Sequence, residues 1–226
     1  MRPSFKKPFL YAVAWHSFRV IFPLYFRWRV LGAEQVPEAG PVILASSHAS
    51  FLDPPLVGTA VWRMCNYLAR ATLFRNPLFN WVLHSVGAIP VDRDGGNAAG
   101  LKRILGRLKE GRAVILFPEG TRSPDGQLHQ ARAGIGLMVL KSGAPVVPVR
   151  ILGSYDCWGR HRLLPRPGRI TVHFGRPLRF DRQAAEAQTC PKERLRELYQ
   201  EVANDIMAAM AALEPLEPEN FRQKNG

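Results

Sequence analysis

"VILASSHASFLDPP", residues 42–55, runs from a short apolar segment through a polar turn to a pair of prolines. The apolar run 42–45 is typical of a buried strand, and Asp53 followed by Pro54 is typical of a helix start, with Asp at the N-cap. The stretch therefore predicts a strand, a turn and a helix in succession. His48 lies in the turn, where it can reach Asp53; on one continuous helix, residues five apart would lie about 140° apart.

The same alternation continues along the chain. Further apolar runs predict buried strands at 65–69, 88–91, 113–117, 146–151 and 170–174. Helical patterns lie at 97–111, 134–142 and 191–213, and glycines suited to C-caps, Gly111 and Gly143, end the first two. Residues 31–226 are therefore expected to form a single α/β domain. Its sheet should be largely parallel or mixed and covered by helices on both faces, with sites at the carboxyl ends of its strands.

Residues 1–30 are expected to form a separate N-terminal helical element at a membrane surface. Their apolar stretch, 9–26, is about as long as a minimal membrane span. Arg19 near its middle would cost at least about 2.5 kcal/mol at the bilayer centre, and Pro23 is expected to break the helix. We therefore predict a broken helix lying in the interface, with basic flanks for anionic headgroups. Packing on the protein's own core and a true span are the alternatives.

The composition is that of a basic globular protein. The 226 residues are 46% hydrophobic, and 31 Lys and Arg against 18 Asp and Glu give a formal charge of +13. Such a charge favours nucleic acid, an anionic membrane or phosphorylated metabolites as partners. The three cysteines form no CxxC pair, and the histidines outside the turn show no ligand spacing, so no disulfide framework and no metal site are expected.

A second polar motif, "LFPEGTRSPDG" at 116–126, also follows a predicted strand. Gly120 permits unusual backbone geometry or a close ligand approach, and Arg122 offers a planar fork of donors suited to phosphate. Thr121 adds a hydroxyl, and Glu119 could orient Arg122 or a substrate hydroxyl. A turn with a surface ion pair is the alternative.

Histidine and carboxylate in the first motif could form a catalytic pair. A neutral His48 held by Asp53 is suited to act as a general base, although both residue types also occupy turns for local reasons. No GxSxG elbow accompanies the neighbouring serines, so we do not expect an acyl-serine intermediate.

Two weaker pieces complete the pattern. In "GAIPVDRDGG", residues 87–96, Arg93 follows a strand and could meet a phosphate or carboxylate. In "GAPVVPVRI", residues 143–151, Pro148 should lie at an irregular or edge position of its strand. A solvated arginine and a plain core strand are the respective alternatives.

In order and type, these four pieces resemble the four motif blocks of the glycerolipid (lysophosphatidic acid) acyltransferase family. The matching segments are "HASFLD", "GAIPVDR", "FPEGTRS" and "VVPV". The resemblance implies His48 as general base with Asp53 as its partner, and it places Pro148 near the acyl site. It also implies an acceptor phosphate bound by the following residues: Arg93, Glu119, Gly120, Thr121 and Arg122. Ser47 replaces a common Asn, and "ARAG" at 131–134 replaces an aromatic and a lysine, which bears on substrate preference.

The resemblance implies transfer of a fatty acyl group from a thioester to the free hydroxyl of an anionic lysophospholipid, with 1-acylglycerol 3-phosphate as the expected acceptor and phosphatidic acid as the product. The co-substrate would be acyl-CoA or acyl carrier protein, with no resident cofactor. Backbone N–H groups near the Asp53 helix start are candidate oxyanion donors. The alternatives are another acceptor, glycerol 3-phosphate or a different lyso-lipid, and a non-catalytic basic membrane- or nucleic-acid-binding protein.

We expect the protein at the cytoplasmic face of the membrane, peripheral or monotopic, with no nucleic-acid partner. The basic segment "RHRLLPRPGR", residues 160–169, bears on that choice. It lacks a nucleic-acid-binding motif, so contact with anionic lipid or with the donor's phosphates is preferred over a nucleic-acid surface or a solvated loop.

Overall fold

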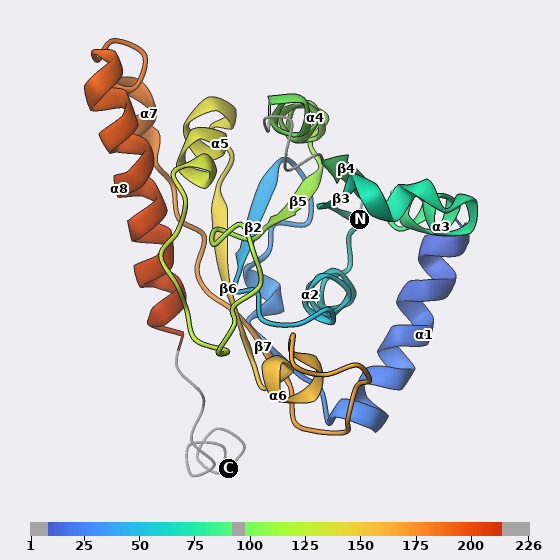
Figure 1. The fold of residues 1–226 in the computed structure, drawn as a ribbon. Helices are drawn as coiled ribbons and strands as arrows, with labels where there is room; N and C mark the ends of the chain where they lie inside the picture. Colours follow the sequence, from blue (N-terminus) through green and yellow to red (C-terminus); the bar gives the residue numbers. More distant parts are fainter. Residues whose placement is uncertain (1–8, 92–97, 214–226) are drawn as a thin grey trace.

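The computed structural model describes residues 9–91 and 98–213, and it shows one seven-stranded sheet with helices on both faces (Figure 1). The strand order is β1-β7-β6-β2-β5-β3-β4, and every neighbouring pair is parallel except β6 and β7. The expected mixed α/β fold is confirmed. The strands are β1 Arg29–Leu31, β2 Val42–Ser46, β3 Cys65–Arg70, β4 Ala88–Val91, β5 Ala113–Leu116, β6 Val146–Leu152 and β7 Thr171–Phe174.

The helices form two layers around this sheet. They are α1 Phe9–Phe26, α2 Asp53–Ala60, α3 Pro77–Ser85, α4 Ala98–Lys109, α5 Gly134–Ser142, α6 Ser154–Trp158, α7 Asp181–Glu186 and α8 Lys192–Ala211. Helices α1 and α2 pack on one face, whereas α4, α5 and α8 pack on the other (Figure 1). Because both faces are covered, the central strands carry continuous apolar runs, and every residue of β2 is buried.

Strand β1 is the first strand at one edge of the sheet. It spans the expected boundary between the N-terminal element, residues 1–30, and the α/β domain. Arg29 pairs with Thr171 of β7 in a parallel register. The sequence did not predict this three-residue edge strand. The predicted glycine caps are confirmed, since Gly111 and Gly143 have φ of 72° and 62°, the left-handed region that ends helices.

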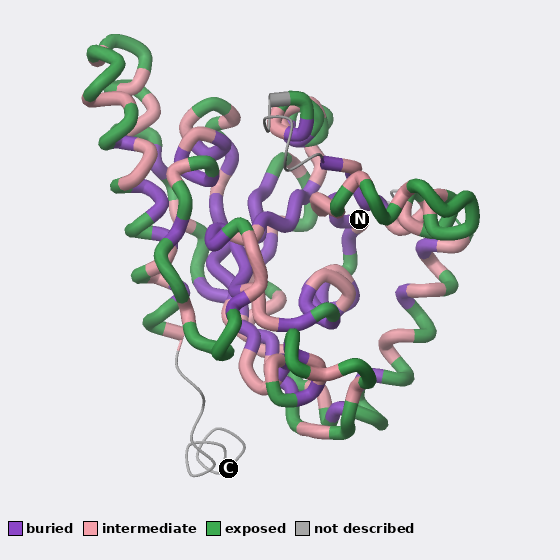
Figure 2. Tube along the Cα trace, viewed as in Figure 1, coloured by how far each residue is buried: buried purple, intermediate pink, exposed green. Residues whose placement is uncertain are grey.

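Helix α1 is continuous through Pro23, so the predicted break is wrong. Pro23 lies in the last turn, where its missing N–H removes only one intrahelical bond. By length and composition α1 is also apolar enough to cross a membrane. Figure 2 shows that buried and exposed positions alternate along it. Its buried side chains, which face the core, are Tyr11, Trp15, Phe22 and Phe26.

Arg19, in the middle of α1, is held against the protein. Its guanidinium lies 4.6 Å from the ring centroid of Trp15 and 4.4 Å from that of Trp62, and it donates a hydrogen bond to the Thr59 carbonyl at 3.2 Å. The charge is thus accommodated beside α2, and the opposite side of α1 remains apolar and exposed.

Candidate active site

Parallel pairing of β2 with β5 brings the two polar motifs together. Ala45 lies opposite Leu116, so the turns that follow the two strands leave the sheet at the same edge. The His48 N–H donates to Glu119 Oε1 at 3.2 Å, and the Ser123 N–H donates to the His48 carbonyl at 2.7 Å. Two segments some 70 residues apart in sequence are therefore joined by one backbone–side-chain and one backbone–backbone hydrogen bond.

His48 and Asp53 are in direct contact. The distance between His48 Nδ1 and Asp53 Oδ2 is 2.9 Å, and the same oxygen accepts the N–H groups of Ala49 and Ser50, each at 2.7 Å. Asp53 has no exposed surface, and its Oδ1 has no hydrogen-bond partner among the residues that the structure describes. Because Nδ1 faces the carboxylate, Nε2 is the ring nitrogen left for a substrate.

Asp53 does not cap α2 with its side chain, so that prediction is wrong. Helix α2 begins at Asp53 itself, with Leu52 at the N-cap position. Pro54 and Pro55 have no N–H, and the Leu56 N–H donates to the Leu52 carbonyl at 2.9 Å. The carboxylate is therefore free to turn back toward the preceding turn.

The amides close to this helix start are already engaged. Asp53 accepts those of Ala49 and Ser50, and the Leu52 N–H donates to Ser50 Oγ. These three groups do not fit the expected role of oxyanion donors, because each already has a protein acceptor. The hydroxyls of Ser46, Ser47 and Ser50 also bond to backbone groups.

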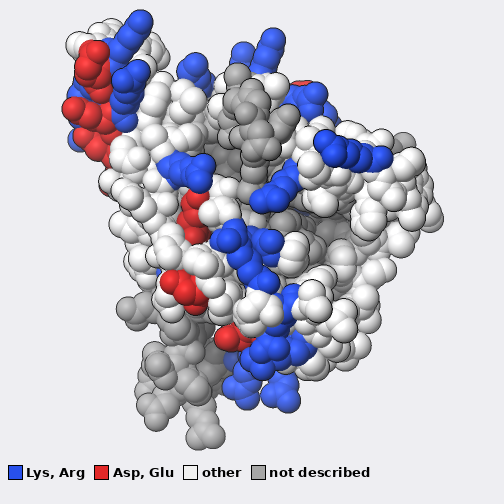
Figure 3. Space-filling view, viewed as in Figure 1, with Lys and Arg blue, Asp and Glu red and all other residues white. Residues whose placement is uncertain are grey.

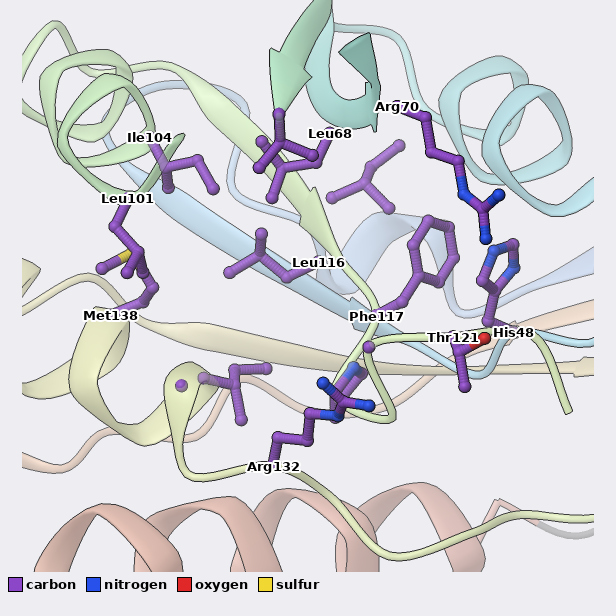
Figure 4. Close-up of a pocket in the computed structure, with 16 residues that line it drawn as sticks. His48, Leu68, Arg70, Leu101, Ile104, Leu116, Phe117, Thr121, Arg132 and Met138 are labelled. Carbon is purple, nitrogen blue, oxygen red and sulfur yellow. The ribbon is translucent and has the colours of Figure 1, made fainter. Parts of the chain in front are cut away.

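His48 lies at the polar end of a cavity of about 390 Å³ (Figure 4). The Phe117 ring stacks on the imidazole, with ring centroids 4.0 Å apart and planes at 21°. Thr121 contributes a hydroxyl beside the histidine. The inner wall is apolar and is lined by Leu68, Leu101, Ile104, Leu116, Ile135 and Met138. The cavity thus combines a base, a hydroxyl and a hydrocarbon-like wall.

Two arginines that the sequence analysis did not single out line this cavity, Arg70 and Arg132. Arg70 ends β3, and Figure 4 shows its guanidinium next to the His48 ring. It follows a predicted strand, which is the signal that identified His48. Arg132 packs over Gly120, where an added Cβ would lie 3.0 Å from the arginine Cδ; the φ of 71° also favours glycine at that position.

Glu119 is a buried carboxylate that holds two turns in place. Its oxygens accept the backbone N–H groups of His48 at 3.2 Å and His129 at 3.4 Å. Burial raises the pKa of its carboxyl, and these two hydrogen bonds lower the pKa in part. That Glu119 orients Arg122 or a substrate hydroxyl stays a prediction.

Thr121 and Arg122 lie on different sides of their turn. Thr121 lines the cavity, and its Oγ1 accepts a hydrogen bond from Arg160. The Arg122 guanidinium lies 3.6 Å from the centroid of the exposed Phe51 ring and does not line the cavity. Arg122 is therefore near the first motif, and its role in phosphate binding stays a prediction.

The two weaker pieces differ in what can be said of them. Arg93 lies outside the described residues. Pro148 lies in the central strand β6 at an irregular point, as predicted, because the ladder with β7 ends at Val149 and Phe174 and a single bridge resumes one residue out of register. The Gly175 N–H donates to the Pro148 carbonyl at 2.8 Å. Pro148 does not line the cavity, and its acyl-site role stays a prediction.

A second, more polar cavity of about 230 Å³ lies on the other side of the His48 turn. Arg150, Ser154 and Tyr155 contribute to its lining. Within residues 9–91 and 98–213, no group of three or more His, Cys, Asp or Glu side chains is placed to hold a metal ion.

Known proteins are similar to this chain in sequence and in fold. A family model described as Acyltransferase matches residues 27–152. A chloroplastic 1-acyl-sn-glycerol-3-phosphate acyltransferase of Brassica napus is 31% identical over 137 residues, which are 59% of this chain and 39% of that protein. An enzyme of the same name from Bacillus subtilis (strain 168) is 29% identical over 188 residues, which are 82% of this chain and 89% of that protein.

The fold also matches a crystal structure, that of PlsC, the 1-acyl-sn-glycerophosphate acyltransferase of Thermotoga maritima. The TM-score is 0.66 at 24% identity, and the match covers 92% of this chain and 80% of that one. This chain spans about two fifths of the length of the chloroplast relatives it matches.

Proposed function

Because this chain belongs to the acyltransferase family, we propose that it transfers a fatty acyl group from an acyl thioester to the free hydroxyl of a lysophospholipid. The proposed acceptor is 1-acylglycerol 3-phosphate and the product phosphatidic acid, in line with the names of the relatives. The observation that carries the proposal is the 2.9 Å contact between His48 and Asp53 at the mouth of a cavity that also contains two arginines.

In the proposed reaction His48 acts as the general base. Its Nε2 takes the proton of the acceptor hydroxyl while that oxygen forms a bond to the thioester carbonyl carbon. The carbon–sulfur bond then breaks, and the imidazolium returns the proton to the departing thiolate. Asp53 fixes the tautomer of the ring through Nδ1 and stabilises the imidazolium. Such proton transfer contributes about 10²–10⁴ in rate.

The cations of the cavity are suited to an anionic headgroup. Arg70 lies beside the histidine, and Arg132 lies across the cavity mouth near Gly120 (Figure 4). Guanidinium groups form charge-assisted, often bidentate hydrogen bonds with phosphate. We propose that these two arginines bind the acceptor phosphate together with the predicted Arg93 and Arg122, and that the apolar wall receives hydrocarbon.

The acyl donor is proposed to be acyl-CoA or acyl carrier protein. A thioester is already activated toward attack by an alkoxide-like oxygen, so the proposed reaction includes neither a resident cofactor nor a metal. The protein is proposed to work at the cytoplasmic face of a membrane, with the exposed apolar side of α1 in the interface. The partly buried helix supports a peripheral or monotopic attachment over a span, because its other side packs on the core.

A donor and acceptor panel tests the function. Purified protein is incubated with acyl-CoA or acyl carrier protein and with lysophosphatidic acid, glycerol 3-phosphate or a neutral lyso-lipid, and the products are identified by mass. Phosphatidic acid as the main product is the expected result. Transfer to glycerol 3-phosphate or to the neutral lipid would replace the acceptor. No transfer in any combination, with salt-sensitive binding to duplex DNA, would favour a non-catalytic nucleic-acid-binding protein.

A further inference from the structure

The exposed large apolar side chains of the described residues are confined to part of the surface. They lie on α1, around α2, on the segment from η2 (Ala71–Arg75) through α3, and on the loop after α6. None lies on α4, α5, α7 or α8 among the described residues. The most exposed pair is in the loop, residues 159–169, where Leu163 and Leu164 are 95% and 78% exposed. Two adjacent leucines in water are unfavourable unless something covers them.

This loop, which we call the arginine–leucine loop, is held by its backbone while its leucines point outward. The Trp158 indole N–H donates to the Leu163 carbonyl at 3.3 Å, and the Tyr25 hydroxyl donates to the Pro165 carbonyl at 3.2 Å. The Arg166 N–H donates to the Cys157 carbonyl at 2.9 Å. A loop ordered in this way loses little conformational entropy on binding.

The Tyr25 contact joins the loop to α1. In Figure 1 the loop lies at the end of α1, and the neighbouring Leu24 is 80% exposed. The exposed apolar side of α1 and the loop that carries the two leucines therefore lie on neighbouring elements. Exposed apolar side chains with a basic border are the pattern that binds membrane interfaces.

The positive charge of the loop favours an anionic lipid surface as its partner. Residues 159–169 contain four arginines and no acidic residue. Figure 3 shows Lys and Arg side chains gathered around α6 and the loop. Arginines beside inserted leucines can keep their guanidinium groups at the phosphates of anionic lipids.

We propose that the arginine–leucine loop is a second membrane-contact site, in which Leu163 and Leu164 insert into an anionic bilayer surface and the flanking arginines bind its phosphates. Arg160 of the loop also donates to Thr121 at the cavity, and the Trp158 carbonyl accepts from Ser50 Oγ. The loop thereby sets the cavity mouth close to the lipid surface. This inference rests on the proposed function only in placing the enzyme at a membrane.

Vesicle partitioning of the full chain tests the proposal. The vesicles are phosphatidylcholine alone or phosphatidylcholine with a quarter phosphatidylglycerol. The double variant Leu163→Ser with Leu164→Ser keeps the backbone contacts and should lower the partition coefficient on the anionic vesicles by about tenfold or more, because the apolar side chains that the loop inserts are lost. Thermal melting checks that the fold is unchanged.

A double arginine variant isolates the electrostatic contribution to vesicle binding. Arg166→Gln with Arg169→Gln should lower partitioning on the anionic vesicles and leave it nearly unchanged on phosphatidylcholine. The matched control, Arg182→Gln with Arg196→Gln, removes the same charge from α7 and α8 and should bind as the wild type does.

Three outcomes would overturn the inference. The leucine variant could partition onto vesicles as the wild type does, or the α7–α8 control could lose as much partitioning as the loop arginine variant. The leucine variant could also keep its vesicle binding and lose only acyl carrier protein binding or self-association. Turnover of a monomeric, short-chain acceptor distinguishes failure of the membrane-contact proposal from failure of the proposed function, because this acceptor is in solution and needs no membrane. The leucine variant should match the wild type in that assay. A chain that binds vesicles through the loop and transfers no acyl group would contradict the function alone.

Discussion

Asp53 concentrates three hydrogen bonds on one carboxylate oxygen. His48 and two backbone amides share Oδ2, while the buried Oδ1 has no hydrogen-bond partner among the described residues. The turn geometry and the orientation of the imidazole are thus fixed by the same group. Any imidazolium that forms during turnover is compensated at the same oxygen, so the charge of Asp53 matters as well as its shape.

Asp53→Asn should lower kcat by about 10²–10⁴, since the amide stabilises neither the imidazolium nor the required tautomer. Steady-state turnover measures the effect. The control is Asp156→Asn on α6, an exposed carboxylate that should retain wild-type turnover. Wild-type kcat in folded Asp53→Asn protein would show that the carboxylate has no part in the reaction.

Arg70→Gln should raise the KM for lysophosphatidic acid by about tenfold to a hundredfold, the usual effect of losing a charge-assisted hydrogen bond. The same change should have little effect on an acceptor with a neutral headgroup. Arg75→Gln, an exposed arginine five residues on, serves as the control. Equal rises in KM for the charged and the neutral acceptors would argue against a phosphate contact.

Glu119 should give a measurable pH dependence of stability. Burial raises its pKa above the ordinary value of 4.5, so the folded state holds this proton more tightly than the unfolded state does. The contribution of Glu119 to the free energy of unfolding is therefore full below the pKa that this carboxyl has in the unfolded state. It is lost as the pH rises through the higher pKa of the folded state. The free energy of unfolding of the wild type minus that of Glu119→Gln should therefore fall across this window in denaturant titrations. A constant or rising difference would refute the assignment.

The sequence predicted some of the residues that the structure brings together at the candidate site and missed others. His48, Asp53 and Thr121 were found because both motifs follow buried strands, and the structure brings them to one edge of the sheet. Arg70 was missed because its approach to His48 depends on the order of strands, which a single sequence does not contain. Arg132 was missed because its packing over Gly120 depends on the path of the loop between β5 and α5. The backbone partners of Glu119 depend on how two distant turns meet.

At the scale of the elements, the contact between α5 and α8 leaves no room for a larger side chain. Gly136 of α5 faces α8 so closely that an added Cβ would overlap the Tyr199 carbonyl. The predicted bounds of α5 are confirmed and those of α8 are within two residues. Both helices carry a clear apolar stripe. Helices α3 and α7, neither of which has a buried residue, and the three-residue edge strand β1 were not predicted.

Gly136→Ala should destabilise the protein by about 1–3 kcal/mol, because the methyl group overpacks a helix contact with no room to relax. Gly106→Ala is the matched control on α4, where nothing lies within 4 Å of the added Cβ. It should stabilise by about 0.5–1 kcal/mol through helix propensity. Thermal or chemical denaturation measures both, and equal effects of the two substitutions would contradict this packing.

At the scale of the whole molecule, the two halves of the surface have different compositions. Helices α7 and α8 carry charged side chains, such as Arg194, which forms salt bridges with Glu186 and Glu201. The exposed large apolar side chains of the described residues lie instead on α1, around α2, on the segment from η2 through α3 and on the arginine–leucine loop. The cavity with His48 lies at the carboxyl edge of the sheet. This arrangement is in line with the proposed uptake of the acceptor from a lipid surface.

The claim on which the account depends is that His48 is the base for acyl transfer. The most direct measurement is the rate at which purified His48→Ala protein forms phosphatidic acid from lysophosphatidic acid and an acyl thioester, beside the wild type and with melting curves for both. We predict a folded variant whose rate is lower by about 10²–10⁴ or more. A folded variant that forms product at the wild-type rate would contradict the account.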